Sequence, residues 1–156
     1  MFDILWHPSP NFNDREGKAI SCLVLHNTAG ACEGALATLC NPRRDKPKAA
    51  VSAHYLVSRA AKVYQLVDDR NSAWHAGNIN KKSIGIEVEA YLSQPGFTPV
   101  QELSLLSLTR WLIAKYGIPA SSIIMHRDVP DAKTACPGFL WPKAEDFVEW
   151  KERYFL

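Results

Sequence analysis

The segment 125–138 concentrates residues that can bind a metal or move a proton: a histidine, a cysteine, two aspartates, a lysine and a threonine. His126 and Cys136 are ten positions apart, too far for one helical turn. They could instead converge on a metal ion from the two ends of a loop. From these two residues alone, a buried cysteine beside a surface histidine is favoured, because single motifs produce many false matches. A metal site needs a third ligand from elsewhere.

His26 is the candidate for that third ligand. It follows the apolar run 20–25, which predicts a short buried strand, and residues 122–125 predict another strand that delivers His126. Ligands collect at the carboxyl ends of strands in α/β proteins, although a hydrogen-bonded histidine at a strand end is the ordinary alternative. If the two strands are neighbours, both imidazoles and Cys136 can meet at one edge of the sheet.

Two histidines and a cysteine would leave one position of a tetrahedral zinc ion open for water, the pattern of a catalytic site. Zinc lowers the pKa of such a water to about 7. A carboxylate in the same cleft could take the water's proton and return it to a leaving amine, and Glu87 is the candidate. Thr134 or Lys133 could stabilise an oxyanion. This set of residues predicts metal-assisted hydrolysis of an amide.

Glu87 lies in a segment, 83–90, that alternates between two faces. Ile84, Ile86, Val88 and Ala90 share one face, and Gly85, Glu87 and Glu89 share the other. Solvated acids on a half-buried strand are the ordinary interpretation. If the strand is central, Glu87 points into a cleft and Gly85 leaves room for a ligand.

Three helices and a hairpin are predicted besides these strands. Thr98 and Gln101 form a capping-box pattern, with Pro99 in the first helical position and Gly117 after the last. The predicted helices cover 32–39, 98–116 and 143–154, and the predicted hairpin strands cover 53–59 and 62–67, with an irregular loop at 68–78. We therefore expect a single α/β domain over residues 1–156, with a central mixed sheet flanked by helices and a zinc site at the sheet edge.

Composition restricts the possible partners. A net charge of +2 and a pI of 8.4 are too mild for nucleic acid, and no apolar run is long enough to span a membrane. The amino-terminal stretch, with Asp3 and no basic region, is unlike a secretory signal peptide, so we expect synthesis in the cytosol. Access to a cell wall would then follow release through a membrane lesion. Three other cysteines, Cys22, Cys32 and Cys40, are expected to be small buried hydrophobic residues that remain as thiols. The basic loop is expected to be a solvated surface or a contact for an acidic substrate, and its charged residues are Arg43, Arg44, Lys46 and Lys48.

Five segments of the chain resemble, in order, the type 2 N-acetylmuramoyl-L-alanine amidases. That family includes lysozyme-type amidases of bacteriophages, bacterial muropeptide-recycling amidases and peptidoglycan recognition proteins. The segments are VLHNTAG (24–30), SAHYLV (52–57), AWHAGN (73–78), SIGIEVE (83–89) and HRDVPDAKTACPG (126–138). Any one of them is weak evidence, but five in order over about residues 20–140 form a specific pattern.

The resemblance implies a central mixed sheet with flanking helices and one Zn²⁺ per chain. The residues that match the family's zinc ligands are His26, His126 and Cys136. The substrate it implies is peptidoglycan or a muropeptide, cut at the amide between the lactyl group of N-acetylmuramic acid and the L-alanine of the stem peptide.

Further roles are carried over residue by residue. Glu87 matches the acid that serves as base, and Thr134 stands where some members have a catalytic lysine, with Lys133 adjacent. Ala53 replaces a tyrosine of the phage type, so that tyrosine's role is absent here. A tryptophan beside a histidine in a loop can be a tethering contact or a sugar-facing pair. The substrate-binding residues that we predict are His75, Trp74, Asn27 and His54.

The short segment between His75 and Ser83 resembles the phage type, whereas recycling amidases carry a longer insertion there. We therefore predict a monomeric phage or prophage-type endolysin. Cytosolic muropeptide recycling is the alternative among enzymes. A non-catalytic peptidoglycan-binding module is a rival, although such relatives typically lack the cysteine ligand that Cys136 matches. A thiol hydrolase with Cys136 as nucleophile is the third interpretation.

Overall fold

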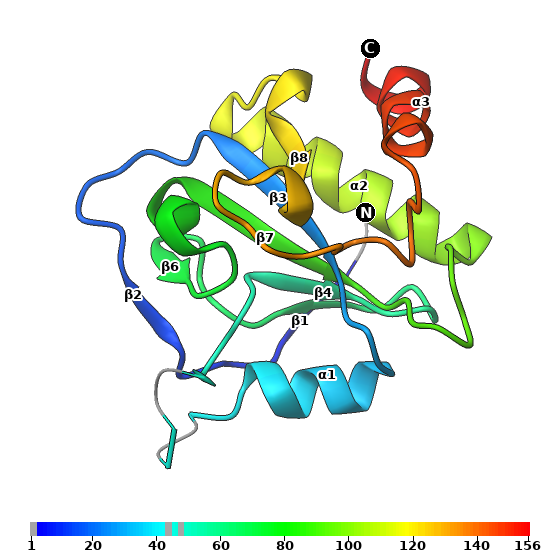
Figure 1. Ribbon diagram of the computed structural model, residues 1–156. Coiled ribbons are helices and arrows are strands. Elements are labelled where there is room, and N and C mark those ends of the chain that lie inside the picture. Colours follow the sequence, from blue (N-terminus) through cyan, green and yellow to red (C-terminus); the bar gives the residue numbers. More distant parts are fainter. Residues whose placement is uncertain (1–2, 43–44, 47–48) are drawn as a thin grey trace.

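A six-stranded mixed sheet forms the centre of the computed structural model, which describes residues 3–42, 45–46 and 49–156 (Figure 1). The strand order is β1-β5-β4-β7-β3-β8. The strands are β1 (Ile4–Trp6), β3 (Cys22–Asn27), β4 (Tyr55–Val57), β5 (Val63–Gln65), β7 (Ser83–Val88) and β8 (Ile123–Met125). Within this sheet β4 and β5 pair antiparallel, and the other neighbours pair in parallel. The predicted fold class, a mixed sheet flanked by helices, is confirmed.

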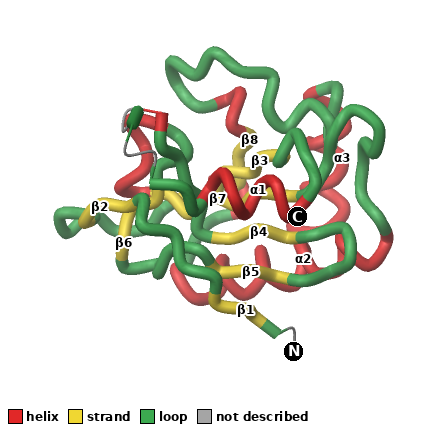
Figure 2. Tube along the Cα trace, turned by 90° about the horizontal axis from the view of Figure 1, so that it is seen from below, coloured by secondary structure: helices red, strands yellow, loops and turns green. Residues whose placement is uncertain are grey.

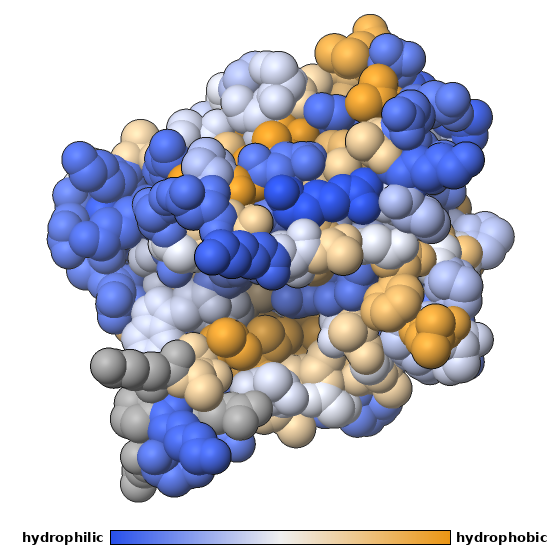
Figure 3. All heavy atoms as spheres, viewed as in Figure 1, coloured by the Kyte–Doolittle hydropathy of each residue, from blue (hydrophilic) through white to orange (hydrophobic). Residues whose placement is uncertain are grey.

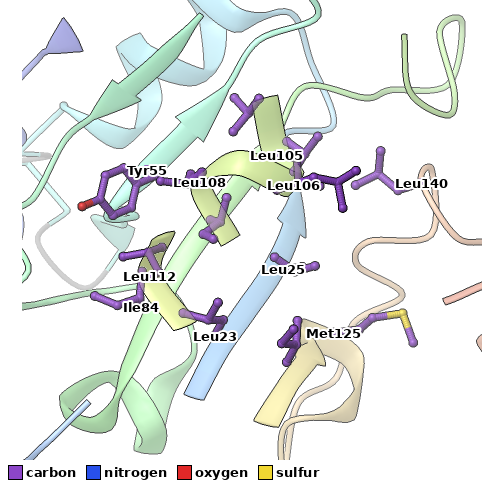
Figure 4. Packing of buried hydrophobic residues seen from close by; sticks show 14 of the residues in the cluster. Leu23, Leu25, Tyr55, Ile84, Leu105, Leu106, Leu108, Leu112, Met125 and Leu140 are labelled. Carbon is purple, nitrogen blue, oxygen red and sulfur yellow. The ribbon is translucent and has the colours of Figure 1, made fainter. Parts of the chain in front are cut away.

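Helix α2 (Pro99–Tyr116) covers one face of the sheet. Its leucines at 105, 108 and 112 are fully buried against the leucines and isoleucines of β3 and β7, as Figure 4 shows. The helix begins with the predicted capping box of Thr98 and Gln101 and ends at Gly117, which has a φ of 64°. Helix α3 (Ala144–Phe155) joins the same layer, because Trp150 Nε1 donates to Glu102 Oε1 of α2 at 3.0 Å.

Helix α1 (Cys32–Leu39) packs on the opposite face, against Leu56 of β4 and Leu66. Figure 2 views the molecule from below, with α1 in front of the strands and α2 behind them. Leu56 pairs with Glu87, and Glu87 pairs with His26. Register partners in a sheet point to the same side, so the side chains of Glu87 and His26 lie on the α1 face.

Glu89 is also on this face, and it departs from the expectation of a solvated acid. It is buried and accepts hydrogen bonds from the backbone N–H groups of Cys32 and Arg59, at 2.9 and 2.7 Å. The carboxylate therefore satisfies a free donor at the start of α1, where negative charge is favoured.

Several element boundaries differ from the prediction. The strand expected at 20–25 continues through His26 and Asn27, because both residues keep their pairing with β7. Three short strands were not predicted: β1, and the pair β2 (Phe12–Asp14) and β6 (Asn71–Ala73), which forms a second sheet. The predicted helices and the hairpin of β4 and β5 are confirmed to within one or two residues at each end.

The remaining expectations concern cysteines, charge and membranes. Cys32 is buried, while Cys22 and Cys40 are half-buried free thiols. In the predicted basic loop, Lys46 is exposed, and Arg43, Arg44 and Lys48 lie outside the described residues. Across the described ranges, none of the helices combines the length and the apolar character needed to cross a membrane.

A buried polar network around His54 connects the loop before β7 to the sheet. His54 is fully buried, its Nδ1 accepts from the Gly85 N–H at 3.0 Å, and its Nε2 lies 3.1 Å from the Asn71 carbonyl oxygen. The Arg15 guanidinium lies 2.8 Å from the same Nε2 and donates to the Ser83 carbonyl. Burial, reinforced by the Arg15 charge, lowers the pKa of His54 to about 4.

We predict an acid-labile component of stability from His54. The unfolded chain takes up a proton at this histidine below about pH 6.5, whereas the folded protein resists protonation until about pH 4. The free energy of unfolding should therefore fall by on the order of 3 kcal/mol as pH drops through this window. Urea unfolding of the metal-free protein, compared with a His54→Asn variant that keeps an acceptor for the Gly85 N–H, measures the difference. Parallel pH profiles for the two proteins would contradict the prediction.

Candidate active site

Three potential metal ligands meet on the α1 face of the sheet. His26 lies on β3, His126 directly follows β8, and Cys136 lies in the loop beyond it. Their ligand atoms all lie within 4.8 Å of one another. His26 Nδ1 is 3.9 Å from Cys136 Sγ, and the ring centroids of His26 and His126 are 4.5 Å apart. The structure brings together the three residues that sequence analysis selected, and this cluster could hold a metal ion.

The loop that carries Cys136 crosses over β3 and β7, as the orange segment of Figure 1 shows. The Asn27 N–H donates to Cys136 Sγ at 3.3 Å, and the Arg127 N–H donates to the Cys136 carbonyl oxygen at 2.9 Å. The Asn27 side chain accepts from the Phe139 N–H at 3.2 Å. Asn27 therefore anchors the loop through both its backbone and its side chain, and this anchoring places the thiol beside His26.

Burial determines the protonation of the three ligands. It lowers the pKa of His26 well below the usual range, reinforced by the neighbouring His126, whose own pKa burial also lowers. Burial raises the pKa of the Cys136 thiol to about 12, and the nearby Glu87 carboxylate adds to this. Neutral imidazoles are the form that binds a metal, whereas this thiol needs an adjacent cation to ionise. The donor set therefore fits a metal ion, and two histidines with one cysteine suit zinc chemistry.

Glu87 stands beside this cluster on β7. The residue is half-buried, and its Oε2 is a buried atom that has no hydrogen-bond partner among the residues described. Burial raises the pKa of this carboxyl group to about 7. Burying a carboxylate oxygen without a hydrogen-bond partner costs free energy, so this oxygen indicates a site where Glu87 would interact with a bound ligand.

Two cavities flank the cluster. The first, of about 440 Å³, is lined by Glu87, the Thr28–Gly30 turn and residues of α1. The second, of about 530 Å³, has Cys136 in its lining, together with Thr134, Phe139 and Arg127 among others. On the face shown in Figure 3, hydrophobic side chains lie in the hollow above α1, and a band of hydrophilic residues lies above them. Glu87 therefore borders one cavity and Cys136 borders the other.

The other residues predicted for the site differ in how far they are exposed. Thr134 is exposed, and its Oγ1 accepts from the Cys136 N–H at 3.1 Å, while Lys133 is exposed on the same loop. Trp74 is half-buried, with a buried Nε1 that has no partner within the described part of the chain. His54 is fully buried within the polar network described above.

His75 lies behind His26, where its Nδ1 is 3.0 Å from His26 Nε2. Its ring also occupies the space above Gly85, since a Cβ added at Gly85 would lie 2.5 Å from His75 Cγ. The room left by Gly85 was predicted for a ligand, and this interpretation is wrong because a side chain of the protein fills it. Ser83, which sequence analysis did not select, contacts the far side of the same ring at 3.0 Å.

Comparison with known proteins identifies relatives of this chain. The family model described as N-acetylmuramoyl-L-alanine amidase matches residues 16–139. N-acetylmuramoyl-L-alanine amidase AmiD of Escherichia coli is 32% identical, with 79% of this chain and 50% of the relative covered. 1,6-anhydro-N-acetylmuramyl-L-alanine amidase AmpD of Salmonella typhimurium is 37% identical over 63% of this chain and 57% of its own length. The endolysin of Enterobacteria phage T3 is 33% identical, with 66% and 65% covered.

The chain thus spans about half of AmiD and somewhat more of AmpD. Among solved structures, a selenomethionine derivative of AmpD aligns with a TM-score of 0.75 over 97% of this chain and 98% of that one. Its sequence identity of 24% makes this a likeness of fold.

We predict that Gly85→Ala destabilises the protein, because the new methyl group would collide with the His75 ring in a closely packed site. The expected loss in the free energy of unfolding is about 1–3 kcal/mol. Gly34→Ala is the matched control, since Gly34 lies within α1 and a Cβ there meets nothing within 4 Å. That variant should be neutral or up to about 1 kcal/mol more stable. Equal effects of the two substitutions in urea unfolding would contradict the packing described here.

Proposed function

Because the chain belongs to the N-acetylmuramoyl-L-alanine amidase family, we propose that it is a zinc-dependent amidase. Its substrate would be the amide that joins the lactyl group of N-acetylmuramic acid to the L-alanine of the peptidoglycan stem peptide. The single observation that supports this most strongly is the convergence of His26, His126 and Cys136 next to the unpartnered carboxylate of Glu87. Relatives that carry the amidase name support the choice of bond.

The zinc ion would be held by His26, His126 and Cys136. When bound, zinc supplies a Lewis acid that activates a water molecule and polarises the scissile carbonyl. The protein contributes neutral imidazoles and a thiol whose position is fixed by the Asn27 N–H. A water molecule in the site could then be reached by the Glu87 carboxylate on the neighbouring strand.

Glu87 would act as general base and then as general acid. A pKa raised to about 7 leaves a substantial fraction of this group ionised at neutral pH, yet makes it a stronger base than an ordinary glutamate. Its Oε2, which has no competing partner in the described ranges, would take the proton of the attacking water. The same oxygen would return that proton to the nitrogen of the departing L-alanine, so the leaving group departs as a neutral amine.

Thr134 is our candidate for stabilising the negative charge that develops on the carbonyl oxygen. Its Oγ1 accepts from the Cys136 N–H, and the hydroxyl hydrogen can point toward the substrate. Lys133 remains the alternative, because its exposed ammonium group is one residue away. Asn27 and Trp74 are retained as proposed substrate contacts at the margin of the site.

Two other chemistries are less well supported. A thiol hydrolase needs an ionised cysteine, but burial raises the pKa of Cys136 to about 12, the opposite of what activates a cysteine nucleophile. A module that only binds peptidoglycan does not require an unpartnered buried carboxylate beside three potential metal ligands.

The biological role has two versions within the same chemistry. We propose a monomeric endolysin-type activity on polymeric peptidoglycan, supported by the similarity to a phage endolysin and by the short connection, Gly77–Lys82, between His75 and β7. Similarity to AmpD supports hydrolysis of soluble anhydro-muropeptides as the second candidate. Mass spectrometry of the products from intact sacculi and from anhydro-muropeptides, run side by side, separates the two.

We predict that Glu87→Gln keeps zinc but loses activity by about 10²- to 10⁴-fold, because the amide cannot accept the water's proton. Metal analysis and the rate of stem-peptide release from sacculi measure the two effects. Glu33→Gln, at an exposed acid of α1, is the control and should match the wild-type rate. A Glu87→Gln enzyme with near wild-type turnover would remove this residue from the mechanism.

We predict that Cys136→Ala loses zinc and activity together, since a thiolate ligand is removed. Cys40→Ala changes a half-buried thiol away from the cluster and should retain stoichiometric zinc. A chelator should inactivate the wild-type enzyme, and added Zn²⁺ should restore it. Stoichiometric zinc in Cys136→Ala, or full activity in the presence of chelator, would contradict the proposed metal centre.

A further inference from the structure

We propose that His75 and Ser83 are positioning residues that fix the tautomer of His26. A hydrogen-bonded relay from the Ile79 carbonyl through these two side chains would leave His26 with its lone pair on Nδ1, the atom that faces Cys136. The part of this inference that concerns metal affinity rests on the proposed zinc enzyme, whereas the tautomer is a property of the protein itself.

The relay consists of three short contacts in series. Ser83 Oγ lies 2.9 Å from the Ile79 carbonyl oxygen. The same Oγ lies 3.0 Å from His75 Nε2. On the other side of the ring, His75 Nδ1 lies 3.0 Å from His26 Nε2. The chain of contacts thus connects a backbone carbonyl to a predicted metal ligand.

The direction of each hydrogen bond follows from the atom at the start of the relay. A carbonyl oxygen can only accept, so the single hydroxyl hydrogen of Ser83 is donated to Ile79. Ser83 Oγ must then accept from His75 Nε2–H. A neutral imidazole carries one proton, so His75 Nδ1 is an acceptor and His26 Nε2–H donates to it. The only unprotonated nitrogen left on His26 is Nδ1, which lies 3.9 Å from Cys136 Sγ.

The surroundings of His75 keep its ring neutral and in place. Burial and the positive or potentially positive groups His26, His54, His126 and Arg15 lower the pKa of His75 well below the usual range. The ring lies against Gly85 and meets the His54 ring edge-on at a centroid distance of 5.7 Å. A second hydrogen bond, from Arg15 to the Ser83 carbonyl at 3.0 Å, holds the backbone that carries the relay's hydroxyl.

The expected consequence is a gain in metal affinity that requires no additional ligand. Without the relay, His26 would populate both tautomers, its ring would lose its fixed orientation, and its Nδ1 would be a weaker base toward the ion. Partners that orient a metal-binding histidine typically contribute about 10- to 100-fold in affinity. Ser83→Ala removes the hydroxyl that fixes His75, so Zn²⁺ affinity should fall by about this factor.

The test measures Zn²⁺ affinity with a competing chelator and, in the metal-free wild-type protein, the ¹⁵N chemical shifts of the histidine ring nitrogens. Ser58→Ala is the matched control, because Ser58 is also buried with a hydrogen-bonded hydroxyl, but it lies at the turn after β4. We expect weaker zinc binding for Ser83→Ala, unchanged binding for Ser58→Ala, and a wild-type spectrum with His26 protonated on Nε2 and His75 protonated on Nε2.

Two results would overturn the relay. One is wild-type zinc affinity in Ser83→Ala, and the other is a His26 ring protonated on Nδ1 in the metal-free protein. A wild-type protein that binds no zinc would instead refute the proposed function, and the ¹⁵N shifts would still decide the tautomer. The two failures are therefore distinguishable.

Discussion

The parallel register between β3 and β7 is the constraint on which the site depends. It pairs His26 with Glu87, so a potential ligand and a carboxylate point to the same side of the sheet. Side chains alternate along a strand, so a slip of one residue in either strand would turn its own His26 or Glu87 away from the α1 face. The alternate positions, Leu25 and Ile86, are fully buried under α2, and this burial opposes such a slip. The packing of the core under α2 thereby keeps His26 and Glu87 pointing to the α1 face.

The second constraint is the enclosure of polar groups around the site. From His26 in the cluster, His75 and then His54 follow in contact with one another, and burial lowers the pKa of each of the three histidines. The same enclosure acts on Glu87 in the opposite direction and makes its carboxyl group a stronger base. Arg15, buried and bonded to several backbone carbonyls, holds the loop that supports these histidines. Desolvation therefore favours both the neutral imidazoles and the more basic carboxylate that the proposed mechanism requires.

Much of this could be predicted from the sequence because local patterns and topology agree. Apolar runs before His26 and His126 predicted two strands, and parallel neighbours necessarily deliver their following residues to one edge. The roles of His75 and Ser83 could not be predicted, because a histidine in a loop looks the same whether it contacts a ligand or another side chain. Arg15 was not selected, because a single arginine in the amino-terminal stretch carries no pattern that indicates burial. The three-residue strands β1, β2 and β6 are too short for a periodic signal.

In the proposed metal centre, two imidazoles and one thiolate from distant parts of the chain surround a single zinc ion. X-ray absorption spectroscopy at the zinc K edge of the purified protein tests it most directly. We expect one sulfur neighbour at about 2.3 Å and two nitrogen neighbours at about 2.0–2.1 Å, with a further light atom completing the shell. A zinc environment without sulfur, or a fully active protein with no zinc edge at all, would contradict it.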